Sequence, residues 1–256
     1  MKAMILAAGR GERMGEMTQK IPKPLTKIGN MTLLEHNLRR VKSAGIIDVV
    51  INVSWLGEQI AKYLEGIDLG LNITILDEGD NMLGTGGGIK QALSVLGKDP
   101  FYLVNADVFS NYKINRSMSL HPGVLGHLVL VTNPPHHQKG DFSIEGEYLN
   151  GGKDQHSNTF SGISLLSPDL LSECVGEIFP LEPVLDKAAE KGLLTGEIHK
   201  GVWLDVGAPE RVVEAERIML QDKLFWKTGV KWRYRVNSTW LSAEGDHLDC
   251  GRLNIY

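Results

Sequence analysis

The chain has 256 residues, which is enough for one large α/β domain with a full core or for two small domains, and we expect one domain followed by a tail. Its 27 Lys and Arg residues stand against 31 Asp and Glu residues, and the net charge of −4 argues against nucleic acid or an anionic membrane as a partner. The two cysteines, Cys174 and Cys250, are far apart and have no C-x-x-C spacing, so neither a disulfide framework nor a zinc knuckle is indicated.

Apolar runs alternate with helical patterns through the first half of the chain. The first run is too short for a signal-peptide core, and no stretch approaches the ~20 residues that span a bilayer, so we expect a cytoplasmic protein. The expected strands are Ala3–Ala8, Val49–Val53, Ile73–Leu76, Phe101–Val104 and His127–Val131, and the expected helices between them are Leu33–Ala44, Trp55–Leu64 and Gly87–Leu96. This alternation predicts βαβ units and a mainly parallel sheet, with ligand-binding loops at the carboxyl ends of its strands.

The pattern changes from about Pro134 onward. Shorter segments with frequent Gly, Asn, Asp and Ser suggest antiparallel hairpins, and we assign them to the same domain. Two further helices are expected, near Pro180–Lys191 and at Pro209–Leu220, where Pro209 suits the first turn. The main domain is therefore expected to cover residues 1–220.

Residues 221–256 form a tail that holds three of the five tryptophans. Between Val230 and Val236, aromatic or aliphatic residues alternate with Lys and Arg, which predicts a strand with one apolar and one basic face. The alternatives for this strand are an added edge strand over the core, a dimer contact, an anion-facing surface or an aberrant terminus. The oligomeric state stays open at this stage.

The loop after the first strand, L-A-A-G-R-G-E-R-M-G-E-M-T-Q-K-I-P-K-P-L, combines glycines with positive charge. Gly9 and Gly11 let the backbone come close to a ligand, while Arg13 and Lys23 bring charge that a polyphosphate needs. The dinucleotide fingerprint would need glycine at Met14, and the sequence has no G-x-x-x-x-G-K-[ST]. The loop therefore predicts a phosphate site of another type.

Two carboxylates follow short apolar runs and could meet near that loop. Asp107 ends the run Phe101–Val104 with Asn105-Ala106-Asp107, and Asp205 lies in W-L-D-V-G. Such a pair could hold Mg²⁺ against phosphate oxygens. Taken alone, Asp107 suits a helix cap or a turn better than a metal ligand.

The motif L-A-A-G-x-G-x-R-M, followed by the Lys of K-P-L, resembles the signature of the sugar-1-phosphate nucleotidyltransferases, and the resemblance covers about residues 1–220. It implies a Rossmann-like, mainly parallel mixed sheet flanked by helices, with a small antiparallel part that binds the acceptor. It also implies two small-molecule substrates, an NTP and a sugar 1-phosphate. An oxygen of the sugar phosphate would attack the α-phosphorus in line and expel pyrophosphate.

The resemblance also assigns roles to residues. Asp107 and Asp205 match the metal-binding aspartates of the family, Lys23 is expected on the reacting phosphates, and Arg13 is expected on the departing pyrophosphate. The residues expected to bind the nucleotide are Ala8, Gly9, Gly11, Glu12, Arg13, Lys23, Gly86 and Gly87, and those expected to bind the sugar are Asn105, Gly140, Asp141 and Asn158.

The loop L-G-T-G-G at Leu83–Gly87 resembles a family segment that faces the base and ribose together with a preceding acidic stretch. That stretch offers Asp77, Glu78 and Asp80, any of which could face the nucleotide. Close packing of the following helix would also explain the glycines. Gly15-Glu16-Met17-Thr18 departs from the R-P-L-T of relatives, so nucleotide affinity is expected to depend more on Arg13 and Lys23.

Further motifs, among them L-V-L-V-x-N-P-x-H-H-x-x-G-D-F and F-S-G-I-S, resemble the bacterial uridylyltransferases of peptidoglycan recycling that act on N-acetylmuramic acid α-1-phosphate. The resemblance implies UTP and that sugar phosphate as substrates. The alternatives are a mannose- or heptose-1-phosphate guanylyltransferase and a noncatalytic nucleotide-sugar sensor. His136 and His137 are expected in a surface loop, where Lys139 could lie near the lactyl carboxylate of the acceptor or be a solvated charge.

Overall fold

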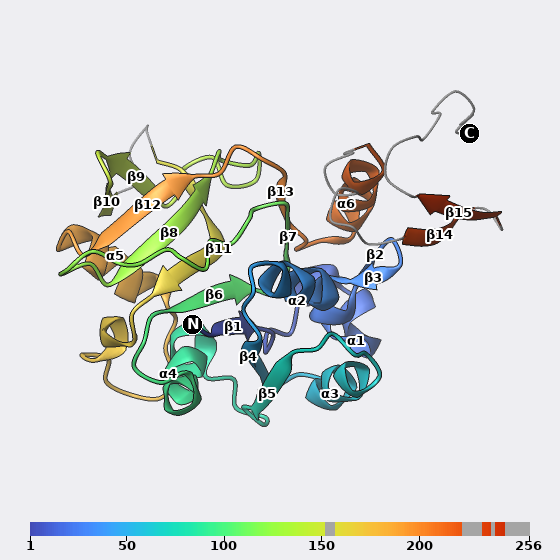
Figure 1. Ribbon diagram of the computed structural model, residues 1–256, viewed down its shortest axis with the longest axis horizontal. Coiled ribbons are helices and arrows are strands. Elements are labelled where there is room, and N and C mark those ends of the chain that lie inside the picture. The colour runs from blue at the N-terminus through green and yellow to red at the C-terminus, as the bar shows by residue number, and fades with distance from the viewer. Residues whose placement is uncertain (152–156, 222–231, 237–238, 244–256) are drawn as a thin grey trace.

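A nine-stranded sheet forms the centre of the molecule, with strand order β5-β4-β1-β6-β11-β8-β12-β10-β9 (Figure 1). The computed structural model describes residues 1–151, 157–221, 232–236 and 239–243. The strands of this sheet are β1 (Ala3–Leu6), β4 (Asp48–Val53), β5 (Asn72–Asp77), β6 (Phe101–Asn105), β8 (Gly126–Val131), β9 (Phe142–Glu145), β10 (Tyr148–Gly151), β11 (Thr159–Leu166) and β12 (Leu194–Ile198).

The helices lie between these strands. They are α1 (Met17–Lys20), α2 (Leu33–Ser43), α3 (Gly57–Glu65), α4 (Gly84–Leu96), α5 (Glu182–Glu190) and α6 (Pro209–Gln221), with short 3₁₀ turns at Glu12–Met14, Lys23–Leu25 and Pro168–Leu171. Two small antiparallel pairs accompany them, β2 (Lys27–Ile28) with β3 (Met31–Thr32) and β7 (Val108–Ser110) with β13 (Trp203–Asp205). The strands and helices expected from the sequence are therefore present, with ends shifted by a few residues.

The strand directions divide the sheet into two parts. β5, β4, β1 and β6 are parallel neighbours, as the βαβ pattern predicts. β11 is antiparallel to both β6 and β8, and β9 and β10 form the expected antiparallel hairpin. One strand of the second part differs from the expectation, because β12 runs parallel to β8. The architecture is the expected Rossmann-like mixed sheet flanked by helices.

Apolar side chains cover both faces of the central strands. In β1, Ala3 and Ile5 join the cluster under α2 and α3, while Met4 joins the cluster under α4 and α5. All three side chains have no exposed area, as expected for a parallel strand buried on both faces. The two layers hold the strand ends, and the loops that follow them, in fixed positions.

A third apolar cluster holds β13 and α6 against β2, β7 and the start of α2. Leu204 and Val206 flank Asp205 and pack with Phe109 of β7, and Met219 of α6 packs with Ile28. These five apolar side chains are all at least nine-tenths buried. Asp205 is therefore carried on a short strand whose adjacent side chains are locked in place.

The tail strand expected between Val230 and Val236 is present as β14 (Trp232–Val236). It pairs with β15 (Thr239–Ala243) in a separate two-stranded sheet, so it is not an added edge strand of the nine-stranded sheet. Figure 1 shows this hairpin at the α6 end of the molecule, apart from the large sheet. The remaining tail residues lie outside the described part of the chain. Within the described part, no helix is long and apolar enough to cross a membrane.

Candidate active site

A cavity of about 460 Å³ opens where β1, β4 and β6 end. Seven of the residues expected to bind substrate line it, namely Ala8, Gly9, Gly11, Glu12, Arg13, Lys23 and Asn105, and so does Asp107, which is expected to bind the metal. The glycine loop and the loop before α4 meet there, at the carboxyl edge of the parallel strands. The structure thus brings together residues from three separate stretches of the chain.

The phosphate-loop candidate has a fixed backbone. Gly11 has a φ of +67°, and a Cβ on it would lie 3.0 Å from the side chains of Lys23 and Thr18, so glycine is required there. The Thr18 hydroxyl donates to the Gly11 carbonyl at 2.9 Å. Trp55 donates its indole N–H to the Thr18 carbonyl at 3.0 Å, and its ring centroid lies 5.6 Å from the Arg10 guanidinium carbon. The loop is therefore braced before any ligand arrives.

Arg13 points its guanidinium toward the W-L-D-V-G segment. A Cβ on Gly207 would lie 3.2 Å from an Arg13 nitrogen, so this glycine leaves the guanidinium its space. No ion pair of Arg13 is present within the described residues, and the residue is exposed. Its donors are therefore open to an anionic ligand.

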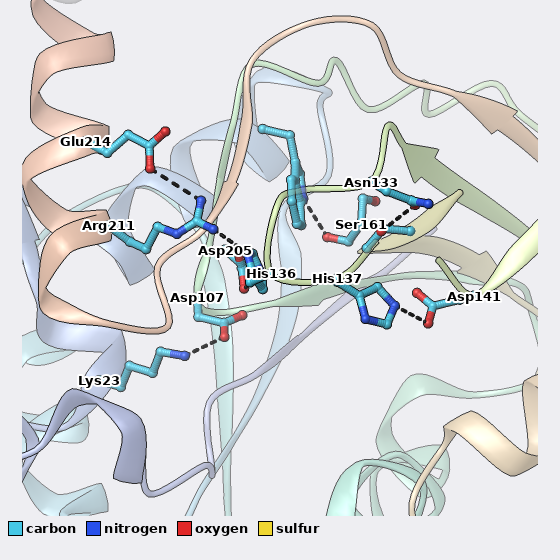
Figure 2. A network of polar contacts seen from close by, with 12 residues as sticks. Lys23, Asp107, Asn133, His136, His137, Asp141, Ser161, Asp205, Arg211 and Glu214 are labelled. Atoms are coloured by element: carbon cyan, nitrogen blue, oxygen red, sulfur yellow. Dashed lines mark hydrogen bonds and ion pairs between the residues drawn. The ribbon is translucent and has the colours of Figure 1, made fainter. Parts of the chain in front are cut away.

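Asp107 makes an ion pair with Lys23. The Lys23 ammonium donates to Asp107 Oδ2 at 2.6 Å, and the two side chains are 12% and 28% exposed. Figure 2 shows both side chains pointing toward each other from opposite walls. The pair neutralises a partly desolvated carboxylate in the absence of substrate.

Backbone pairing brings Asp205 next to Asp107. Asp205 is opposite Val108 in the β7–β13 pair, and the amide of Val206 donates to the Asp107 carbonyl at 2.9 Å. Asp205 Oδ1 is buried and has no hydrogen-bond partner within the described residues. A carboxylate oxygen without a hydrogen-bond partner suits a divalent cation that also binds phosphate oxygens and water, although Asp205 is not among the residues that line the cavity. No cluster of three or more His, Cys, Asp or Glu side chains that could hold a metal ion occurs in the described part of the chain.

The sequence analysis missed a contact to Asp205. His136, expected only in a surface loop, approaches Asp205 Oδ2 with its Nε2 at 3.1 Å, and its Nδ1 contacts the guanidinium of Arg211. Arg211 in turn donates to Glu214 at 3.3 Å. Figure 2 shows these side chains in a row that ends at Asp205. The two adjacent histidines therefore contact different carboxylates, since His137 Nε2 lies 2.8 Å from Asp141 Oδ1.

A buried amide supports the Asn105-Ala106-Asp107 turn from behind. Asn37 of α2 is 1% exposed and donates to the Ala106 carbonyl at 3.1 Å and to the Leu33 carbonyl at 3.0 Å. Its own carbonyl oxygen accepts from Arg40. Burial lowers the pKa of Arg40 to about 10, which leaves the guanidinium charged at neutral pH. Nothing in the sequence marks Asn37 as different from any polar helix residue.

The structure identifies Glu78 as the member of the acidic stretch that faces the cavity. Glu78 accepts from the Asn52 side chain at 2.6 Å and from the Leu83 amide at 2.9 Å. Asp77 instead closes a turn by accepting from the Gly79 amide at 2.8 Å, and Asp80 is not among the lining residues. Asn52 also lines the cavity, and the sequence analysis had not singled it out.

Gly86 and Gly87 do not line the cavity, and Gly84 and Thr85 do. The amides of Gly86 and Gly87 donate to the Phe179 carbonyl at 3.0 and 3.1 Å, so they are already used. A Cβ on Gly87 would lie 2.1 Å from the Glu177 carbonyl oxygen. Close packing therefore requires the two glycines, while their neighbours Gly84 and Thr85 line the cavity, and contact of Gly86 and Gly87 with the nucleotide stays a prediction.

Three of the residues expected to bind sugar, Gly140, Asp141 and Asn158, lie outside the cavity lining, whereas Asn105 lies within it. The amides of Asp141 and Phe142 donate to the Asn158 carbonyl at 2.8 and 3.1 Å, and Asp141 Oδ2 accepts from the Phe160 amide at 2.8 Å. These contacts join the loop after β8 to the start of β11. Lys139 of the same loop is exposed.

Comparisons with known proteins agree on one family. Residues 3–113 match the MobA-like NTP transferase domain. A protein of Neisseria meningitidis named N-acetylmuramate alpha-1-phosphate uridylyltransferase is 41% identical over 229 residues, which cover 85% of this chain and 98% of the relative. The chain belongs to the sugar-1-phosphate nucleotidyltransferase family.

Other members of this family are more distant. A mannose-1-phosphate guanyltransferase of Neurospora crassa is 29% identical over 82% of this chain and 62% of its own length. The solved structure of a putative glucose-1-phosphate thymidylyltransferase from Bacillus anthracis superposes with a TM-score of 0.73 at 20% identity, over 87% of this chain and 96% of that one. The fold and the nucleotidyltransferase activity class are thus those of the family.

Gly87 and Gly9 have different predicted roles, the first in packing and the second in ligand binding, and substitution by alanine tests the difference. Gly87→Ala must displace the Glu177 carbonyl, and we expect it to lower the free energy of unfolding by about 1–3 kcal/mol. Gly9→Ala meets nothing within 4 Å, so stability should stay within about 0.5 kcal/mol while NTP affinity falls. Urea denaturation and calorimetric NTP titration measure the two effects. Equal stability of both variants would contradict the packing assignment.

Proposed function

We propose that the protein transfers the uridylyl group of UTP to N-acetylmuramic acid α-1-phosphate, forming the UDP-sugar and pyrophosphate, in the cytoplasmic recycling of peptidoglycan. The observation that carries this proposal is the 41% identity over 98% of the length of a relative named for that activity. The cavity supports it because a glycine loop, the cationic residues Arg10, Arg13 and Lys23 and the carboxylate of Asp107 line it. Small-molecule substrates fit a site of this size.

Two carboxylates of the chain would hold Mg²⁺, namely Asp107 and Asp205. The bound cation supplies charge neutralisation for the reacting phosphates. Asp205 offers a buried oxygen with no protein partner within the described residues. Asp107 directly precedes the neighbouring strand, and its carbonyl accepts from the amide of Val206, the residue after Asp205. Catalysis then consists mainly of orientation and charge stabilisation, and no covalent enzyme intermediate is required.

Lys23 has two roles in this proposal. Without substrates its ammonium neutralises Asp107, at 2.6 Å. With substrates bound, the same ammonium turns to the reacting phosphates, where it stabilises the negative charge that develops during transfer. Arg13, with the amides of Gly11 and Glu12, binds the leaving pyrophosphate.

The remaining cavity residues are assigned to the nucleoside and the sugar. Gly84, Thr85 and the Asn52–Glu78 pair form the wall that would face the base and ribose. Asn105 would contact the acceptor sugar. The Gly140 amide donates to the His137 carbonyl and the Asp141 amide donates to the Asn158 carbonyl, so these residues hold the shape of the loop after β8. Contact of Gly140, Asp141 and Asn158 with the sugar stays a prediction.

The second candidate is a mannose-1-phosphate guanylyltransferase. It is favoured by the relative from Neurospora crassa with that printed name, at 29% identity. The two candidates share the phosphate chemistry and differ in the base and the acceptor. They are therefore separated by substrate preference and not by loss of a site residue.

The metal assignment predicts the effect of neutralising either aspartate. Asp107→Asn and Asp205→Asn should each lower turnover by roughly 10²-fold or more, because one major electrostatic contact at the transition state is lost. Pyrophosphate release at saturating Mg²⁺ measures the loss, and far-UV circular dichroism checks the fold. Near-normal Mg²⁺-dependent turnover in either variant would remove that aspartate from the ligand set.

The role of Lys23 predicts a loss that does not depend on the base. Lys23→Ala should lower turnover with every accepted NTP by a similar factor, on the order of 10²-fold, since the ammonium contacts phosphates. Initial rates with UTP, GTP, dTTP and CTP measure it. A variant that kept its rate but changed its NTP preference would place Lys23 at the base instead.

A matrix of four NTPs against four acceptors tests the proposed substrates. N-acetylmuramic acid, N-acetylglucosamine, glucose and mannose 1-phosphates are each offered with each NTP, and pyrophosphate is measured. We expect the highest kcat/KM for UTP with N-acetylmuramic acid 1-phosphate. A clear preference for GTP with mannose 1-phosphate would establish the second candidate, and no turnover in any well would favour a nucleotide-sugar sensor. Asp205→Asn serves as the matched inactive control.

A further inference from the structure

We propose that His136 is a positioning residue that fixes the orientation of the Asp205 carboxylate, with Arg211 fixing His136 in turn. The proposal rests on the proposed function, because Asp205 matters here as a metal-binding carboxylate. His136 comes from the loop after β8, and Arg211 comes from α6. Figure 2 shows Glu214, Arg211, His136 and Asp205 in sequence along one network.

The donor and acceptor groups of this network allow one set of hydrogen-bond directions. A guanidinium only donates, so His136 Nδ1 must accept from Arg211. A neutral imidazole then carries its proton on Nε2 and donates it to Asp205 Oδ2, 3.1 Å away. The Arg211 charge is balanced by Glu214, at 3.3 Å. The chain Arg211→His136→Asp205 therefore runs in one direction and ends on a single carboxylate oxygen.

The two oxygens of Asp205 have different surroundings. Oδ2 is occupied by His136, while Oδ1 is buried without a hydrogen-bond partner within the described residues. Free rotation of the carboxylate would exchange the two oxygens, and the His136 contact opposes that exchange. Groups that hold a ligating carboxylate in this way tune metal affinity without touching the metal.

His136 is itself held by a well-bonded loop. Asn133 donates to the carbonyls of Gln138 and Ser157 at 2.9 and 3.0 Å, and His137 bonds Asp141 at 2.8 Å. The ring of His136 is 39% exposed, whereas Arg211 is 18% exposed behind it. The loop thus presents one histidine to Asp205 and uses the other to stabilise itself.

The test uses three substitutions in and near this network. His136→Ala removes the donor, His136→Gln keeps one donor and one acceptor on a neutral side chain, and Gln138→Ala changes an exposed side chain of the same loop outside the network. UTP affinity is measured by calorimetry without acceptor, across a range of Mg²⁺ concentrations and in excess EDTA. No turnover takes place, so the readout is independent of activity.

For His136→Ala we expect the Mg²⁺ midpoint of UTP binding to rise about 10-fold, the lower end of what such supporting groups contribute. UTP affinity in excess EDTA should stay unchanged, and Gln138→Ala should match the wild type. His136→Gln should recover most of the shift. An unchanged midpoint in His136→Ala, or equal losses in EDTA and in Mg²⁺, would overturn the positioning role.

Asp205→Asn separates this inference from the proposed function. If Asp205→Asn shifts the Mg²⁺ midpoint and His136→Ala does not, only the positioning role fails. If neither changes it, the assignment of Asp205 as a metal ligand fails as well. A different substrate pair in the kinetic matrix would leave the calorimetric result for His136 valid, since the measurement is repeated with the preferred NTP.

Discussion

The pairing of β7 with β13 is the constraint on which the site depends. It sets Asp205 opposite Val108 and joins the Val206 amide to the Asp107 carbonyl, so Asp205 ends one strand and Asp107 directly precedes the neighbouring one. A carboxylate withdrawn from water needs a cation or a hydrogen-bond donor to balance its charge. Lys23 balances one and the His136–Arg211 chain supports the other, and each of these groups comes from a different segment.

The surroundings of this pair are rigid for simple physical reasons. The strands that carry the cavity are covered by apolar side chains on both faces, and Leu204 and Val206 anchor Asp205 from either side. The Asn37 amide fixes the turn before Asp107. A site whose function is orientation and charge stabilisation gains from such preorganisation, because little rearrangement is left for the reaction itself.

The sequence could predict features that depend on local pattern. Continuous apolar runs identified the buried strands, and Gly11 was singled out because glycine lets the backbone come close to a ligand. The structure gives Gly11 a φ of +67°. The glycine loop predicted in this way does line the cavity. The roles of Gly86 and Gly87 could not be separated in the same way, since a glycine needed for ligand approach and one needed for packing against Phe179 look identical in one sequence.

The sequence also could not predict contacts between segments that are far apart in the chain. His136 and Arg211 meet only because the loop after β8 and the helix α6 converge on β13, and no spacing rule connects them. Asn37 is hidden for the same reason, since its partner Ala106 is remote in the sequence. Glu78 could be distinguished from Asp77 and Asp80 only once the turn at Gly79 was seen.

Asp107 and Asp205 lie in different segments of the chain, which limits where segments can be exchanged with those of a relative. The family domain matched at residues 3–113 contains Asp107, but Asp205 lies far beyond it, in the part that also carries the acceptor loop. A chimera that took a new acceptor half from a relative would import a foreign carboxylate together with its supporting histidine and arginine. Exchange of the segment after β8 would therefore also exchange Asp205, one of the two proposed metal ligands, and a functional chimera has to preserve the β7–β13 register.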